Sequence, residues 1–208
     1  MTPYKLPLRE ACAEFTEKKS RFIGYVSPVA SEAEARAFVQ SVRERHREAN
    51  HHVFAYRLKE GEIYRFNDDG EPSGTAGMPL LNTFLKQDIY DFCAVAVRYF
   101  GGIHLGAGGL TRAYSRSGII ALEAAGVGFM RELALCAVKV PYALYENTKR
   151  LLIASETSIT AEDFGVEVTL EFSLVAEELA DLQAKITELT LGKVYITELG
   201  VRNAVGIC

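Results

Sequence analysis

The stretch RYFGGIHLGAGGL, residues 98–110, places five of the chain's 17 glycines in 13 positions. It follows the apolar run FCAVAV (92–97) and precedes a helical pattern, so we expect it to join a strand buried on both faces to a helix. Glycines at such a junction allow two backbones to pack closely. They also expose N–H groups at a helix start, which bind anions well.

The spacing of these glycines excludes two known phosphate-binding motifs. Gly101 and Gly106 are spaced as in a P-loop, but Ala107 follows where that motif needs lysine. A dinucleotide fingerprint fails as well, because its third glycine would fall on Thr111. The candidate anion- or RNA-binding residues are therefore chosen because N–H groups at a helix start bind anions. The alternative explanation is that the glycines allow tight packing and the arginines are ordinary surface residues. The candidate set comprises Arg98, Gly101, Gly102, His104, Gly106, Gly108, Gly109, Arg112 and Arg116.

Arg112 and Arg116 are four residues apart and share one face of the expected helix. That face differs from the one marked by Ala113, Tyr114 and Ser117, so we expect the two arginines to be exposed.

Arg98 closes the apolar strand, where an unpaired guanidinium would be costly to bury. It needs either a carboxylate or an anionic ligand. The loop NDDGEPSGTAGMP (67–79) offers Asp68, Asp69 and Glu71. An internal ion pair and a ligand site are both compatible with the sequence.

The same loop allows two interpretations. Its carboxylates could hold Mg²⁺, although their spacing matches no calcium loop. Its turn chemistry also suits a tight turn in which Ser73 or Thr75 caps the following helix. His51 and His52 point to opposite faces of a strand, so we expect one to face a cleft and the other to be hydrogen-bonded in the core. The supporting set is His51, His52, Asp68, Asp69, Glu71, Ser73 and Thr75, and we expect no catalytic residue, metal or cofactor.

Composition is that of an ordinary globular protein, with 49% hydrophobic and 24% charged residues among 208. No apolar run approaches the roughly 20 residues that span a bilayer, and the N-terminus does not resemble a secretory signal. Cys12, Cys93, Cys136 and Cys208 lie far apart and are expected to be reduced thiols. We therefore expect a cytoplasmic protein with no membrane association.

Charge is distributed unevenly. The net charge of −4 argues against extensive coating of nucleic acid. Residues 1–130 carry 16 Lys and Arg against 15 Asp and Glu, whereas residues 131–208 carry 7 against 12. Residues 92–122 contain no carboxylate, so the glycine stretch lies in a locally positive field that an anionic ligand would sense.

Periodicity places the remaining elements. A capping box at Ser31 and Glu34 predicts the start of a helix. We expect a hairpin formed by residues 51–58 and 62–66. We also expect a short helix over residues 76–87 and another helix from Leu110 to about residue 125. A glycine pair at 126 and 128 marks a boundary between domains 1–130 and 131–208. The second domain reads strand (134–141), helix (145–155), hairpin (159–172), helix (179–189) and strand (193–199). This β-α-β-β-α-β order is the ferredoxin-like motif.

Three blocks of this sequence resemble the YigZ/IMPACT family: HHVFAY (51–56), DDGEPSGTAGMP (68–79) and VRYFGGIHLGAGGLTRAY (97–114). They occur in family order within residues 20–125, and the C-terminal portion is similar to the small domain of bacterial YigZ-type members. The resemblance implies an α+β fold, with an N-terminal ribosomal-protein-like β/α domain followed by the ferredoxin-like domain.

The resemblance also implies a role linked to translation, since eukaryotic IMPACT proteins act in translational control. Those proteins use an RWD domain for which this chain is expected to have no room, so their kinase-control mechanism is not carried over. Our first hypothesis is a non-catalytic protein that binds RNA or a ribosome-associated surface. The alternatives are a nucleotide- or phosphate-binding enzyme with a Mg²⁺-holding DDGEP loop, and a scaffold that pairs with another protein through its ferredoxin-like domain.

Overall fold

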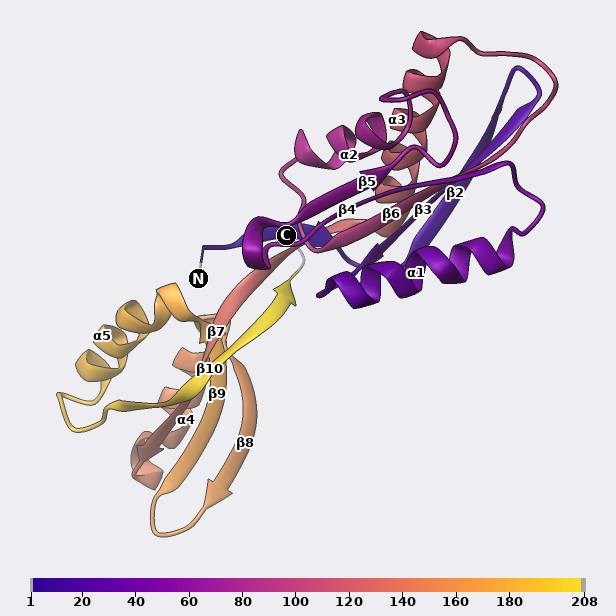
Figure 1. The fold of residues 1–208 in the computed structure, drawn as a ribbon. Coiled ribbons are helices and arrows are strands. Elements are labelled where there is room, and N and C mark those ends of the chain that lie inside the picture. The colour runs from indigo at the N-terminus through magenta and orange to yellow at the C-terminus, as the bar shows by residue number, and fades with distance from the viewer. Residues whose placement is uncertain (1, 207–208) are drawn as a thin grey trace. The chain divides into compact units, whose positions relative to one another are not determined.

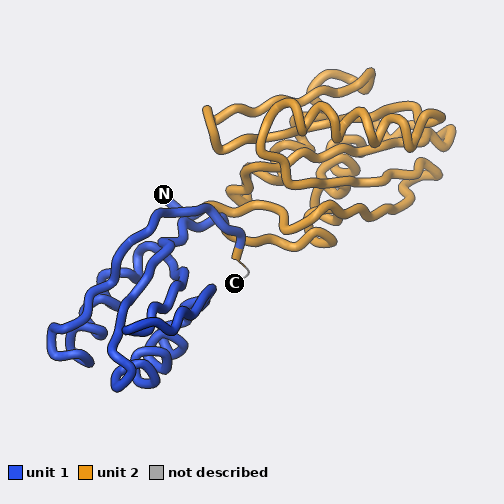
Figure 2. Tube along the Cα trace, turned by 90° about the horizontal axis from the view of Figure 1, so that it is seen from below, with its two compact units in different colours: residues 1–3, 130–205 blue, residues 4–129, 206–208 orange. Residues whose placement is uncertain are grey.

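The structure, a computed structural model, describes residues 2–206 (Figure 1). The chain divides into two compact units, which Figure 2 colours separately. One comprises residues 4–129 with Gly206, and the other comprises residues 130–205 with Thr2 and Pro3. Within the described residues the strands form two five-stranded sheets.

The N-terminal unit is built on an antiparallel sheet with the order β2-β3-β6-β4-β5. Helix α1 covers one face of this sheet, and helices α2 and α3 cover the other (Figure 1). The strands are β2 (Ala11–Glu17), β3 (Ser20–Pro28), β4 (His51–Arg57), β5 (Tyr64–Asn67) and β6 (Phe92–Tyr99), and the helices are α1 (Glu32–Arg45), α2 (Gly77–Leu85) and α3 (Ala107–Ala125). A 3₁₀ turn, Glu60–Glu62, lies between β4 and β5.

β6 is the central strand and is buried on both faces, which confirms the prediction from its continuous apolar sequence. Cys93, Val95 and Val97 pack on the α1 side. Phe92, Ala94 and Ala96 pack against α2 and α3.

The starts of helices α1 and α3 were predicted with different accuracy. α1 begins as expected, because the Ser31 side chain accepts a hydrogen bond from the Glu34 amide at 3.2 Å. α3 begins at Ala107, three residues before the predicted start at Leu110. Gly108 and Gly109 are therefore helical and do not belong to the loop.

The strands before residue 29 were not predicted. β2 and β3 form a hairpin whose turn residues, Lys18 and Lys19, have φ values of 45° and 64°. Two successive left-handed residues are the requirement of a type I′ turn, which is usually met by Asn and Gly. A Lys-Lys turn carries no such compositional signal.

The C-terminal unit has the predicted β-α-β-β-α-β order. Its strands are arranged β10-β7-β9-β8, and β1 (Tyr4–Pro7) also pairs with β7. Two helices supply the apolar residues that pack with this sheet. The elements are β7 (Val127–Val140), α4 (Tyr142–Ala154), β8 (Ser158–Phe164), β9 (Val168–Val175), the 3₁₀ turn Ala176–Glu178, α5 (Leu179–Leu189) and β10 (Ile196–Gly206).

Two further sequence expectations concern the chain as a whole. In the described part of the chain, no helix is both long and apolar enough to cross a membrane. Cys12 is exposed and Cys93 and Cys136 are buried, all three as free thiols, while Cys208 lies outside the described residues.

Candidate functional site

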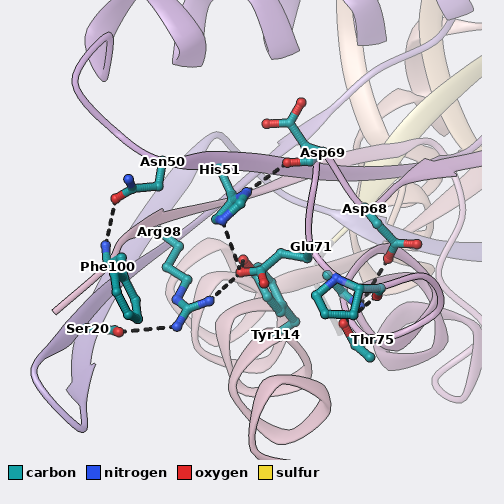
Figure 3. Close-up of polar contacts among 12 residues, drawn as sticks. Ser20, Asn50, His51, Asp68, Asp69, Glu71, Thr75, Arg98, Phe100 and Tyr114 are labelled. Carbon is teal, nitrogen blue, oxygen red and sulfur yellow. Dashed lines mark hydrogen bonds and ion pairs between the residues drawn. The ribbon is translucent and has the colours of Figure 1, made fainter. Parts of the chain in front are cut away.

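Arg98 forms a buried ion pair with Glu71, which decides the question the sequence left open. Its Nη1 lies 2.6 Å from Glu71 Oε1, and the two side chains are only 5% and 4% exposed (Figure 3). Arg98 Nη2 also donates to Ser20 Oγ at 3.4 Å. The guanidinium lies 5.4 Å from the Phe22 ring centroid and 5.3 Å from that of Phe100, within cation–π range.

The Glu71 carboxylate joins β6 to helix α3. Its Oε1 accepts a second hydrogen bond, 2.6 Å long, from the hydroxyl of Tyr114 (Figure 3). Tyr114 is fully buried, and burial, followed by the bond to Glu71, raises the pKa of its hydroxyl well above the usual range. Among the described buried groups, Arg98 Nε is left without a hydrogen-bond partner.

The two neighbouring histidines lie on opposite faces of β4, as expected. His51 is paired in register with Arg98, and its Nε2 lies 3.8 Å from Glu71 Oε1. Its Nδ1 lies 2.8 Å from the carbonyl oxygen of Asp69, which can only accept, so Nδ1 carries the hydrogen. In the neutral ring Nε2 is therefore an acceptor. His52 points the other way and bonds through Nε2 to the His46 carbonyl at 2.9 Å.

Asp68, and not Ser73 or Thr75, caps helix α2. Asp68 Oδ1 accepts from the amides of Ala76 and Gly77 at 3.1 and 2.7 Å, and its Oδ2 accepts from Gly74 at 2.9 Å. Ser73 is exposed, and the Thr75 hydroxyl donates back to the Pro72 carbonyl at 2.6 Å. The capping prediction was wrong because the loop folds back, so that a carboxylate eight residues earlier reaches the helix start.

The carboxylates of the DDGEP loop do not converge on a common point. Asp69 binds Arg43 at 2.9 Å and the His52 amide at 2.6 Å, and in Figure 3 its carboxylate points away from Glu71. Asp68 caps α2, and Glu71 holds Arg98. Across residues 2–206, no group of three or more His, Cys, Asp or Glu side chains is arranged to hold a metal ion. The geometry therefore gives no support to a Mg²⁺ role for this loop.

Four of the five glycines in the quoted stretch meet one of two structural requirements. A Cβ on Gly101 would lie 2.0 Å from the Lys19 carbonyl oxygen, and one on Gly109 would lie 2.9 Å from Leu105 Cβ, so both positions require close packing. Gly102 and Gly106 have φ values of 82° and 73°, with nothing within 4 Å of an added Cβ. These two shape an open turn that leads into α3. Close packing therefore explains Gly101 and Gly109, and a left-handed backbone explains Gly102 and Gly106.

The first turn of α3 lies between two cavities. The helix begins after Gly106, has no side-chain cap and carries no acidic residue in its first turn. This leaves backbone N–H groups and the positive end of the helix dipole free to meet an anion. Leu105 lines both cavities.

The larger cavity, of about 390 Å³, lies between the Arg98–Glu71 pair and the glycine turn. We call it the β6–α3 pocket. It is lined by Asn50, His51, Glu71, Pro72, Arg98, Phe100, His104, Leu105, Gly106, Ala107 and Leu110.

The smaller cavity, of about 280 Å³, carries the cations, and we call it the arginine pocket. Arg112 and Arg116 line it and are exposed, as predicted from the helical spacing. The Arg116 guanidinium lies 4.3 Å from the ring centroid of Phe15. The arginine pocket is lined by Phe15, Glu17, Lys18, Leu105, Gly109, Arg112, Ala113 and Arg116.

Several residues of this site were not singled out from the sequence. Asn50 and Phe100 line the β6–α3 pocket, and the Asn50 side-chain oxygen accepts from the Phe100 amide at 2.8 Å. Tyr114 was assigned to the apolar face of α3, where its hydroxyl in fact binds Glu71. Lys18 reaches the arginine pocket from a hairpin that the sequence did not reveal. The one sequence signal for these pocket residues was Phe100, an exposed aromatic residue directly after the buried strand β6.

Comparison with protein-family models gives matches for both units. Residues 18–122 match the Impact N-terminal domain, and residues 138–193 match a domain of unknown function, DUF1949. The chain belongs to the IMPACT family. The match to the first model contains every lining residue of the β6–α3 pocket and, of the arginine pocket, all but Phe15 and Glu17.

Bacterial members of the IMPACT family align with most of this chain. The chain is 38% identical over 186 residues to the IMPACT family member YvyE of Bacillus subtilis, covering 89% of this chain and 86% of that protein. It is 34% identical to the IMPACT family member YigZ of Escherichia coli, covering 86% and 89%. The Protein IMPACT homolog of Dictyostelium discoideum aligns over 96 residues at 40% identity, covering 44% of this chain and 27% of that protein.

A solved crystal structure of a protein described as hypothetical has the same two-domain fold. It superposes with a TM-score of 0.61 at 31% sequence identity and covers 96% of this chain and 98% of its own. The α+β, two-domain architecture expected from the sequence is thereby confirmed.

Proposed function

We propose that this IMPACT-family protein is a non-catalytic, cytoplasmic RNA-binding protein of the translation apparatus, and that it engages RNA or an RNA-bearing ribosomal surface at the start of α3. The observation that carries the proposal is the uncapped first turn of α3, flanked by the exposed Arg112 and Arg116 within a span of 31 residues that contains no carboxylate. A helix N-terminus and two arginines together suit phosphate groups.

The charge pattern argues for a small footprint. Glu17 borders the arginine pocket, and residues 131–208 carry 12 acidic residues against 7 basic ones. A short single-stranded segment meets these limits better than a long duplex, because few phosphates need to approach the protein. The link to translation rests on family membership and on the similarity of the N-terminal unit to proteins named IMPACT.

The test is binding of a short single-stranded RNA across a salt series. Each phosphate contact to single-stranded nucleic acid contributes about −0.7 to the slope of log K against log salt. Replacing Arg112 and Arg116 with alanine should therefore weaken binding and make this slope shallower by about 1.4.

The matched control removes the same amount of charge from another surface. Arg36 and Lys86 are both exposed and line neither cavity. The Arg36→Ala plus Lys86→Ala variant should bind RNA with the wild-type slope. Equal losses in the two double variants, or RNA binding without salt dependence, would show that the start of α3 is not the site.

A further inference from the structure

We propose that the β6–α3 pocket holds one unpaired nucleobase of the bound RNA. This inference rests on the proposed function and deepens it. It assigns the arginine pocket to the sugar–phosphate backbone and the β6–α3 pocket to a base turned out of the strand.

The size and walls of the β6–α3 pocket suit a flat aromatic ring. Its volume of about 390 Å³ falls within the roughly 300–1,000 Å³ typical of small-molecule sites. Pro72, Phe100 and the two leucines, Leu105 and Leu110, supply its apolar walls. Phe100 is 41% exposed and lies with its ring centroid 5.3 Å from that of the exposed His104, so both rings are available for stacking.

The ion pair in the pocket favours a neutral ligand over an anion. Arg98 would attract a phosphate if it were free, but Glu71 lies 2.6 Å from its guanidinium and cancels its charge. A phosphate entering here would meet the Glu71 carboxylate as well as Arg98. A nucleobase carries no charge and loses little on entering an apolar cavity that offers hydrogen bonds.

Polar groups that can pair with the edge of a base line the same pocket. His51 Nε2 is an acceptor in the neutral ring, because Nδ1 donates to the Asp69 carbonyl. The Asn50 side-chain oxygen is occupied by the Phe100 amide, which leaves its NH₂ group as a donor. Every base carries donors or acceptors on its Watson–Crick edge, and proteins read unpaired RNA bases through such groups.

The two cavities are close enough to serve one RNA strand. Leu105 lines both. Gly106, directly before α3, and Ala107 in its first turn line one cavity, and Gly109 in the same turn lines the other. A base in the β6–α3 pocket therefore places its neighbouring phosphates beside the free N–H groups of α3 and near Arg112.

The experiment compares a short single-stranded RNA with the same oligonucleotide made abasic, which keeps every phosphate. Stacking of a base on an aromatic side chain contributes about 1–3 kcal/mol, so the complete RNA should bind about 5- to 150-fold more tightly than the abasic strand. A 2-aminopurine placed in the RNA should change fluorescence on binding, because its ring enters the pocket.

Two pairs of variants locate the effect. Ala107 is exposed at the pocket rim, so Ala107→Trp should block the pocket and reduce RNA affinity to that of the abasic strand. Ile119→Trp, at an exposed position of α3 outside both cavities, should bind as wild type. Phe100→Leu should lose most of the preference for the complete RNA, and Phe100→Tyr should keep it.

Equal binding of complete and abasic RNA by the wild-type protein would overturn the base pocket while leaving the RNA-binding proposal intact. A base preference that Ala107→Trp and Phe100→Leu leave unchanged would also overturn it. If neither oligonucleotide binds, the proposed function itself fails, and the base pocket fails with it.

Discussion

Glu71→Gln removes the negative charge that compensates Arg98 in the buried pair, while nearly preserving the shape of the side chain. Breaking a buried ion pair by removing one partner costs about 3–5 kcal/mol, because the remaining charge stays buried. We expect a loss near 3 kcal/mol, the lower end of that range, since the glutamine oxygen can still accept from Arg98 and Tyr114. For a chain of 208 residues this corresponds to a Tm lowered by about 6–12 °C.

An exposed ion pair of equal length provides the control. Arg21 and Glu14 also approach to 2.6 Å, but their side chains are 52% and 54% exposed, against 5% and 4% for Arg98 and Glu71. Glu14→Gln should leave the Tm almost unchanged, because solvent screens that pair.

The measurement is thermal and urea unfolding of both variants, followed by circular dichroism. Adding Arg98→Met to Glu71→Gln should recover part of the lost stability, because the uncompensated charge is then gone. If Glu71→Gln unfolds at the same temperature as Glu14→Gln, the buried pair does not stabilise the fold as argued.

Two other predictions test the packing and the pH response. Gly24→Ala should lower the free energy of unfolding by about 1–3 kcal/mol, because its Cβ would lie 2.1 Å from the Ser117 carbonyl oxygen of α3. Gly108→Ala should raise it by up to about 1 kcal/mol, because the added Cβ meets only Arg112 Nη1 at 3.6 Å. Urea unfolding measures both variants, and equal effects would refute the assigned contacts. Burial, and then the nearby Arg21, hold the pKa of His46 in the folded protein below its usual value near 6.5. Below about pH 6.5 the unfolded chain therefore binds more protons than the folded protein. The free energy of unfolding falls as the pH drops through the pKa of the folded state. Urea unfolding between pH 7.5 and 5 should show a shallower fall for His46→Gln than for wild type, and parallel curves would exclude His46 as the cause.

The fold was predictable where one segment carries its own signal. The capping box and apolar stripe of α1, and the unbroken apolar run of β6, each depend on residues adjacent in sequence or spaced by one helical turn. β2 and β3 were not predicted, because their turn is made by Lys18 and Lys19, whose left-handed φ values in the hairpin are not indicated by residue type.

The candidate site was predictable as a set of residues but not as a set of partners. The sequence indicated that Arg98 needs a carboxylate and offered three. The path of the loop decides among them, because it turns Asp68 toward the N–H groups of α2 and Asp69 toward Arg43, and leaves Glu71 facing Arg98. Contacts of this kind depend on the tertiary path of the chain, which no local pattern encodes.

The central position of β6 also sets an order of events during synthesis. β3 and β4 both precede residue 60, yet each is hydrogen-bonded to β6 in the finished sheet and not to the other. At about 5–20 residues per second, the ribosome needs roughly 2–8 s after Arg57 to complete β6. Until β6 is complete, the edges of β3 and β4 that pair with it are uncovered, and uncovered strand edges invite aggregation. A pause in translation between Arg57 and Tyr99 therefore prolongs the period in which β3 and β4 lack the strand with which they pair.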